Sequence, residues 1–273
     1  MRIGVIGTGN MGSILVEAMI VANAISPSSL SIHNRTRAKA ELLRQEYPDI
    51  QIFDDAEKLV QANDCLFICV KPHDIFPLLK KIKPHIQREH CIISITSPVS
   101  VEQLEYHVNC SIARIIPSIT NRALTGVSLF TFGTNCCDSW KTQLLQLFKC
   151  FSKPYEISQN ITRVASDIVS CGPAFYSYIT RRFIDGAVQE TEIDTETATV
   201  LVSEMLIGLG ELLRQGHYTL STLEEKVTVK GGITGEGIKV LENELDGVFE
   251  KLFQATHAKF REDLERVKDQ FGI

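Results

Sequence analysis

The most constraining feature of the chain is an apolar stretch that leads directly into a glycine-rich turn near its start. Residues 2–12 read RIGVIGTGNMG, and Gly7, Gly9 and Gly12 form the pattern G-x-G-x-x-G. The first glycine allows a tight bend, the second lets a pyrophosphate approach the backbone, and the third lets the next helix pack close to the strand. The helix expected over residues 13–22 then offers unpaired N–H groups to the anion. The pattern predicts a dinucleotide site, whose remaining loop residues are Thr8, Asn10 and Met11.

Composition and charge are those of an ordinary globular chain. Of 273 residues, 44% are hydrophobic and 22% are charged, and the formal net charge is −5. This balance provides no basic surface for nucleic acid, and no apolar stretch reaches the roughly 20 residues that span a bilayer. The first strand starts too early to leave room for a signal peptide. We therefore expect a cytoplasmic protein with no nucleic-acid or membrane partner.

Eight cysteines are spread along the chain without any C-x-x-C pair. Cys65, Cys69 and Cys91 lie in apolar, strand-like runs, where cysteine packs as a small hydrophobe. Because the ligand spacing of zinc sites is missing, no metal is expected. Cys171 and its neighbour Ser170 lack the G-x-S-x-G context of a nucleophile elbow. We expect Cys171 to pack at a close helix contact.

Short β-branched runs alternate with polar helical segments through the first half of the chain. This alternation is typical of a parallel sheet wound by helical crossovers. The sequence therefore predicts an α/β fold with an N-terminal Rossmann-type, doubly wound and mostly parallel sheet. The expected strands cover residues 3–6, 30–32, 50–53, 66–70, 92–95, 112–116 and 127–132.

After Pro154 the pattern changes to long helical stretches. Apolar residues recur at spacings of three and four, which predicts helices over 174–191, 195–215 and 247–271. We expect a boundary near Ser158, with a cofactor domain at 1–158 and an all-helical dimerisation and substrate domain at 159–273. A homodimer would bury the excess apolar surface of these helices, and the alternative is that the domain packs on itself and on the sheet. The apolar side chains concerned are Phe175, Tyr178, Ile179, Met205, Leu206 and Ile207.

The end of the second expected strand indicates which nicotinamide cofactor is used. An NAD enzyme usually places Asp or Glu about 20 residues after the glycine turn to bind the ribose 2′-OH. This chain has Asn34, Arg35, Thr36 and Arg37 there instead. Hydrogen-bond donors and positive charge suit a 2′-phosphate, which a carboxylate repels. NADP(H) is therefore expected, and the alternative is that the two arginines are only solvated at a helix start.

Residues that follow the strands are the next candidates, because ligands of open α/β sheets bind beyond the carboxyl ends of the strands. Val70, Lys71 and Pro72 follow the fourth strand, and segments 94–98 and 116–118 follow the fifth and sixth. Together they are expected to line the nicotinamide side of a cleft. This position makes Lys71 a catalytic candidate, and the alternative is a solvated surface cation.

Taken in order, these segments resemble pyrroline-5-carboxylate reductases. The matching pieces are IGTGNMG, NRT, VKP, IPS at 116–118, CGPAF at 171–175 and KGGITGEG at 230–237. Their joint order is more specific than any single motif. The resemblance implies NADPH-dependent reduction of the cyclic imine 1-pyrroline-5-carboxylate to L-proline. It also implies a helical domain that interlocks in a dimer or higher oligomer, with a substrate cleft completed across the subunit interface.

The resemblance places the substrate at the loop of residues 230–234. Gly231 and Gly232 precede a helical segment, and their N–H groups suit a carboxylate. Thr234 is the candidate to hydrogen-bond the imine nitrogen, directly or through water. Lys230, which stands where the family has proline, adds a donor and a charge beside this pocket, unless it is only a solvated loop lysine. Ile233 completes the loop.

Several positions depart from the family pattern. The family's A-G pair near the nicotinamide is Ser97-Pro98 here, and its M-P-N ends in Ser118. Its G-S-G-P-A reads SCGPA at 170–174, so that Cys171 stands where the family has serine, and its S-P-G-G-T-T reads VKGGIT. In these departures the chain resembles the divergent branch called late competence protein ComER. Fold and cofactor can persist while the substrate changes. Two alternatives therefore stay open: a reductase of another small imino or keto acid, and an NADP-binding regulatory protein, linked to competence, that has lost catalysis.

Overall fold

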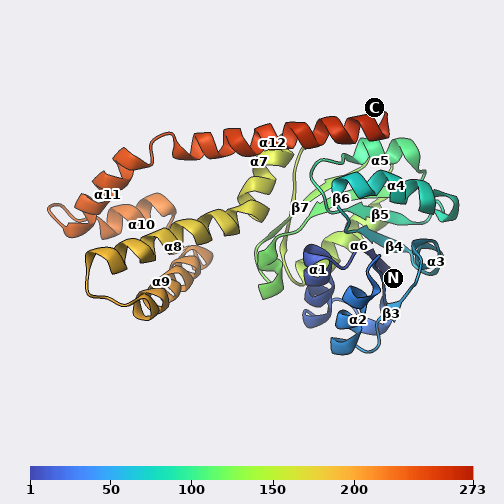
Figure 1. Cartoon of the computed structure of the whole chain (residues 1–273), viewed down its shortest axis with the longest axis horizontal. Helices are drawn as coiled ribbons and strands as arrows, with labels where there is room; N and C mark the ends of the chain where they lie inside the picture. Colours follow the sequence, from blue (N-terminus) through green and yellow to red (C-terminus); the bar gives the residue numbers. More distant parts are fainter. Residues whose placement is uncertain (273) are drawn as a thin grey trace. The chain divides into compact units, whose positions relative to one another are not determined.

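The computed structural model describes residues 1–272 and contains one eight-stranded sheet (Figure 1). The strands lie in the order β3-β2-β1-β4-β5-β6-β7-β8. β1 to β6 run parallel, β7 runs antiparallel to β6, and β8 runs parallel to β7. This mostly parallel sheet confirms the expected fold class. The strands are β1 (Ile3–Ile6), β2 (Leu30–His33), β3 (Gln51–Ile52), β4 (Cys65–Ile68), β5 (Cys91–Ser94), β6 (Ser111–Ile116), β7 (Val127–Phe132) and β8 (Lys153–Glu156).

Helices cover both faces of the sheet, and each face has its own apolar cluster. Ile3, Val5 and Phe67 belong to one cluster, whereas Ile6 and Leu66 belong to the other. Neighbouring residues of a strand point to opposite faces, so a strand buried on both faces is apolar throughout. The helices of this part are α1 (Asn10–Val21), α2 (Arg37–Glu46), α3 (Ala56–Ala62), α4 (Pro72–Ile82), α5 (Val101–His107), α6 (Asp138–Lys149) and α7 (Thr162–Ser166).

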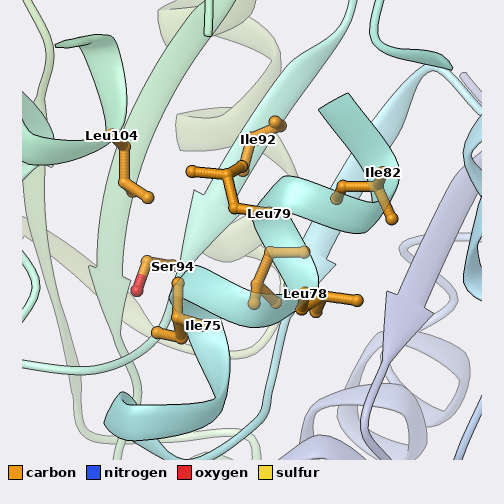
Figure 2. Close-up of a pocket in the computed structure, with 8 residues that line it drawn as sticks. Ile75, Leu78, Leu79, Ile82, Ile92, Ser94 and Leu104 are labelled. Carbon is orange, nitrogen blue, oxygen red and sulfur yellow. The ribbon is translucent and has the colours of Figure 1, made fainter. Parts of the chain in front are cut away.

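A small apolar pocket illustrates how tightly α4 packs on the sheet (Figure 2). Ile75 and Leu79 of α4 lie over β5, where Ile92 and Ser94 face them, and Leu104 of α5 lies beside them. The pocket has no room for a water molecule. It is therefore a gap between core side chains and not a ligand site.

The second half of the chain is helical, as the apolar spacing predicts. α8 (Gly172–Glu190) follows a π-helical segment, Asp167–Cys171. α9 (Thr195–Gln215) begins at Asp194, whose carboxylate accepts a hydrogen bond from the N–H of Thr197, and it ends at Gly216, whose φ is 72°. Such acceptors at the start and left-handed glycines at the end are the usual helix limits. The remaining helices are α10 (Leu220–Val227), α11 (Ile233–Glu244) and α12 (Val248–Phe271).

By packing, the chain divides into two compact units. The first comprises Met1–Pro173 and Thr256–Ile273, and the second comprises Ala174–Ala255. The boundary near Ser158 stays a sequence-based prediction, whereas the division by packing falls after Pro173 and again within α12. The reason for the second division lies in α12: its Val267 and Phe271 are buried in the apolar cluster shared by α3, α4 and α5. The last helix therefore contributes to both units along its length.

Two strands differ from the sequence expectation. The run at 50–53 forms only the two residues of β3, and β8 was not expected at all. β8 is an edge strand with the exposed, polar sequence KPYE. Charged residues and proline are tolerated in an edge strand. Because this sequence does not alternate between apolar and polar side chains, the pattern did not predict a strand here. Among the described residues, no helix has the length and apolarity needed to cross a membrane.

Candidate active site

The glycine turn between β1 and α1 is shaped by close backbone contacts. Gly7 has a φ of 102°, and a Cβ atom there would lie 2.6 Å from the carbonyl oxygen of Cys69. A Cβ on Gly12 would lie 1.9 Å from the carbonyl oxygen of Gly7, whereas a Cβ on Gly9 would meet nothing within 4 Å. Glycine is thus required by the protein itself at positions 7 and 12. At Gly9 the space beside the backbone is open, as the approach of a ligand would require.

The loop also contains hydrogen-bonding groups that the protein does not use. Thr8 is 3% exposed, and its hydroxyl has no hydrogen-bond partner among the described residues. α1 begins after Gly9 without a capping side chain, so the N–H groups of its first turn are unpaired by side chains. Buried polar atoms normally have a partner. A phosphate group seated on this loop would supply one, so the loop fits the pyrophosphate of a dinucleotide.

Asn34 connects this loop to the segment that follows β2. Its Oδ1 accepts a hydrogen bond from the N–H of Thr8 at 3.0 Å, and its Nδ2 donates to the carbonyl oxygen of Thr36 at 2.9 Å. Both ends of the amide are therefore engaged with the backbone. Asn34 holds the two loops in register, a role that the sequence pattern alone did not show.

The cations near β2 are not equivalent. Arg37 pairs with Glu41 and with Asp54, so its charge is already compensated. Arg35 is exposed, and no ion pair involves it among residues 1–272. Lys39, which sequence reasoning missed, lines the two pockets on either side of this segment. The sequence feature that could have identified Lys39 is its position at the start of α2, directly after the segment expected to bind the 2′-phosphate.

A pocket of about 640 Å³ runs along the carboxyl ends of β2, β1 and β4. It brings together most of the expected cofactor residues. At one end lie Asn34, Arg35 and Thr36, and at the other lie Val70 and Lys71. Pro72 lines a neighbouring pocket that shares Lys71 with the first. Gly7 and Gly9 lie between, whereas Thr8 and Asn10 line the pocket on the other side of the loop.

Ser97, which follows β5, is held by two arginines from distant segments. Its carbonyl oxygen accepts a hydrogen bond from Nη1 of Arg114 at 3.3 Å, and its Oγ accepts one from Nη1 of Arg163 at 3.2 Å. Arg163 in turn donates to Asp167 at 2.8 Å, and the side chain of Asp167 is 0% exposed. Oδ2 of Asp167 also accepts a hydrogen bond from Thr256. Sequence reasoning missed this network.

The loop after β6 is tied to the same π-helical segment. Ser118 Oγ donates to the carbonyl oxygen of Val169 at 2.8 Å, and Ser170 Oγ donates to that of Pro117 at 2.9 Å. Cys171 is half-buried, its Sγ lies 3.6 Å from Nη2 of Arg163, and burial raises the pKa of the thiol. The thiol is therefore protonated at neutral pH.

The expected substrate loop lies in the second unit. Gly231 has a φ of 75°, and Gly232 precedes the first residue of α11 without a capping side chain. Ile233 is 92% exposed, and Lys230 and Thr234 are exposed as well. The structure thus joins these residues in one exposed turn at the start of a helix of 12 residues. Within the turn, the N–H of Gly232 donates to the carbonyl oxygen of Val229 at 2.9 Å.

Comparison with known proteins covers both halves of the chain. Residues 2–98 match the family model described as NADP oxidoreductase, coenzyme F420-dependent, and residues 159–263 match pyrroline-5-carboxylate reductase dimerisation. The chain is 54% identical to ComE operon protein 4 of Bacillus subtilis over 100% of both proteins. It is 29% identical to pyrroline-5-carboxylate reductase 3 of Bacillus subtilis, over 98% of this chain and 99% of the relative.

The chain belongs to the pyrroline-5-carboxylate reductase family. This confirms the resemblance seen in the motifs, and the match of residues 2–98 confirms the expectation of an NADP(H)-type cofactor domain. The fold is that of a Plasmodium falciparum pyrroline carboxylate reductase with NADP bound. That structure has a TM-score of 0.82 and 22% identity, over 99% of this chain and 98% of the other.

Three departures from the reductase pattern lie together in the structure. Ser97, Ser118 and Cys171 are each linked by hydrogen bonds or contacts to residues 163–170. The changes are therefore coupled, because each replaced side chain contacts a partner in the same short stretch.

Proposed function

We propose that the protein reduces 1-pyrroline-5-carboxylate to L-proline with NADPH. The observation that carries this proposal is that likeness to the reductases extends over both halves, the cofactor half and the dimerisation half. Many proteins share a Rossmann domain, but far fewer join it to this helical domain. A reductase needs a cofactor loop, an acceptor site for a carboxylate and a proton donor.

The residues of the first unit would hold the cofactor as follows. Gly7, Gly9 and Gly12, with the loop residues between them, bind the pyrophosphate through backbone N–H groups. Arg35 and Thr36 bind the 2′-phosphate, with Lys39 as an additional cation. When bound, NADPH supplies the hydride. The remaining cofactor contacts are proposed for Asn10, Met11, Asn34, Val70, Pro72 and Ser97.

The loop 230–234 would hold the substrate. Backbone N–H groups of Gly231 and Ile233 bind the carboxylate at the start of α11, beside Gly232, whose own N–H donates to the carbonyl oxygen of Val229. Lys230 strengthens this anion site. The Thr234 hydroxyl donates a hydrogen bond to the imine nitrogen. Lys71, whose ammonium has no ion pair among the described residues, is proposed to favour anionic groups in the cleft. In the homodimer, one subunit completes the cleft of the other.

The test is NADPH oxidation by the purified full-length protein with 1-pyrroline-5-carboxylate, together with detection of L-proline. We expect turnover that saturates in both ligands. Thr234→Val should lower kcat by about 10²-fold or more and leave the NADPH Kd unchanged, whereas Thr234→Ser should keep most of the activity. Absence of turnover with both ligands saturating would disprove the proposal.

A second candidate is a reductase of a different small imino or keto acid. It is favoured by Lys230 and Ile233 in the substrate loop and by Ser97 and Ser118 beside β5 and β6. The same assay with other cyclic imines and with keto acids distinguishes the two. Turnover of one of these and not of 1-pyrroline-5-carboxylate would establish it. NADPH binding with no turnover of any compound would instead indicate a regulatory protein that has lost catalysis.

A further inference from the structure

Arg114 of β6 is the largest fully buried side chain among the described residues. It is 1% exposed. Its Nη2 donates to Thr162 at 2.6 Å and to Thr131 at 3.1 Å, and its Nη1 donates to the carbonyl oxygen of Ser97 at 3.3 Å. Nε has no partner among residues 1–272. All the groups that contact the guanidinium are neutral.

The charge of Arg114 is consequently uncompensated. Across the described part of the chain, no carboxylate lies within 4.0 Å of it, and Glu102, on the exposed side of α5, attracts it only from farther away. The nearby Arg163 is different, because Asp167 neutralises it at 2.8 Å. Burial lowers the pKa of Arg114 to about 10, so the side chain is still charged at neutral pH. An isolated buried charge is expensive, and proteins normally pair it.

The position of this charge follows from the strand order. Arg114 lies beside Ser94, the last residue of β5, in the parallel register of β5 and β6. The 2′-phosphate segment follows β2 and the pyrophosphate loop follows β1, so a cofactor running onward along the sheet edge passes β4 and reaches β5. The nicotinamide end is therefore the end nearest Ser97, to whose carbonyl oxygen Arg114 is bonded.

We propose that Arg114 is a buried cation that makes the nicotinamide site bind the reduced cofactor in preference to the oxidised one. The inference rests on the placement of the cofactor under the proposed function. The dihydronicotinamide ring is neutral, whereas the oxidised ring carries one positive charge. A fixed positive charge beside the ring therefore weakens the binding of the oxidised cofactor and not that of the reduced one. Since water and salt screen a buried charge weakly, the effect persists at physiological ionic strength.

This arrangement has a use in reduction. The oxidised cofactor is the product of hydride transfer, and a site that repels its charge releases it readily. The hydrogen bonds of Arg114 to Ser97, Thr131 and Thr162 keep the charge at a fixed place, because a rigid, planar guanidinium bound at three points does not reorient toward solvent. Arg114 would act through the electrostatic field of its charge and through its hydrogen bond to Ser97, as a positioning residue that does not touch the nicotinamide ring.

The test compares three ligands on the full-length protein by calorimetry: NADPH, NADP⁺ and 2′-phospho-ADP-ribose, which lacks the nicotinamide ring. For the wild type, the Kd of NADP⁺ should exceed that of NADPH by about tenfold or more. In Arg114→Met the ratio should fall by about fivefold or more, while the Kd of 2′-phospho-ADP-ribose stays the same. Arg114→Lys, which retains the charge, should retain most of the ratio.

The ratio of the Kd of NADP⁺ to that of NADPH is insensitive to partial unfolding, because an unfolded fraction raises the apparent Kd of all three ligands by the same factor. Equal affinity of the wild type for NADPH and NADP⁺ would overturn the proposal without any variant. So would an unchanged ratio in Arg114→Met, which would leave Arg114 as a structural residue. Failure of imine reduction is a separate result, since these affinities are measured without substrate.

Discussion

The three glycines of the opening turn differ in the atoms that surround them. Position 12 requires glycine because a Cβ there would clash with the carbonyl oxygen of Gly7. Position 7 requires glycine because a Cβ there would clash with the carbonyl oxygen of Cys69. Gly9 has an extended backbone, with φ of −76° and ψ of −165°, that alanine can adopt without strain. The folded protein therefore does not require glycine at position 9, and we expect the pyrophosphate of the cofactor to require it.

This contrast gives a matched pair of variants. Gly9→Ala should unfold at the same temperature as the wild type within a few degrees but bind NADPH at least about tenfold more weakly, since its methyl group occupies the ligand's space. Gly12→Ala should lower the melting temperature itself, because its Cβ meets backbone that cannot move aside. Thermal unfolding and fluorescence titration measure both effects. Normal NADPH affinity in Gly9→Ala would show that the pyrophosphate lies elsewhere.

Residues whose role depends on near neighbours could be predicted from the sequence, and those with distant partners could not. The glycine turn lies within six residues, and its steric demands follow from its spacing. Arg37 was a candidate phosphate ligand in the sequence, but in the fold it pairs with Asp54, which compensates its charge. Arg114 and Thr162 are 48 positions apart, and Thr256 and Asp167 are 89 apart. No periodicity in the sequence reports such contacts.

At the scale of elements, the end of α12 packs into the core of the first unit. The ring of Phe271 lies 4.8 Å from that of Phe76 and 5.4 Å from that of His107, measured between centroids. The Phe271 carbonyl oxygen accepts a hydrogen bond from Nε2 of His107 at 3.1 Å. Val267 and Phe271 are both buried in the cluster formed with α3 to α5. The helical spacing of four residues predicted that these two share a face, but not which surface covers it.

Removing this anchor should weaken the whole first unit. Phe271→Ala leaves a cavity the size of an aromatic ring and should lower the free energy of unfolding by about 3 kcal/mol or more. Lys268→Ala, on the exposed side of the same helix, is the control and should change it by less than about 0.5 kcal/mol. Urea denaturation measures both. Equal stability of the two variants would mean that α12 is not part of the core.

On the scale of the whole molecule, the second unit exposes a large amount of apolar surface. Ile184, Ala198 and Val202 form a small buried cluster there. Of the side chains expected at a dimer interface, Phe175 is half-buried and the others are exposed. The neighbouring helix residues Tyr176, Phe183 and Leu201 are 67%, 64% and 58% exposed. A surface of this kind is normally covered by another chain.

We therefore predict that the protein is a dimer and that α9 contributes to its interface. Leu201→Glu places a charge on this surface and should raise the dimer dissociation constant at least about a hundredfold, because the carboxylate would be buried unpaired. Glu196→Gln, an exposed position of the same helix about 140° around the axis from Leu201, is the control. Sedimentation velocity over a range of concentrations measures the change. A wild-type protein that sediments as a monomer at all concentrations would contradict the prediction.

The first unit is assembled from two separate stretches of sequence, and α12 supplies the second of them. During synthesis, the sheet and the helices α3 to α5 leave the ribosome long before Val267 and Phe271, which complete their apolar cluster. This cluster stays open to water, and to chaperones, until Phe271 has been translated and has cleared the exit tunnel. Nascent chains that stop after α11 should therefore be recognised as incomplete by quality-control proteases, although every strand is already present.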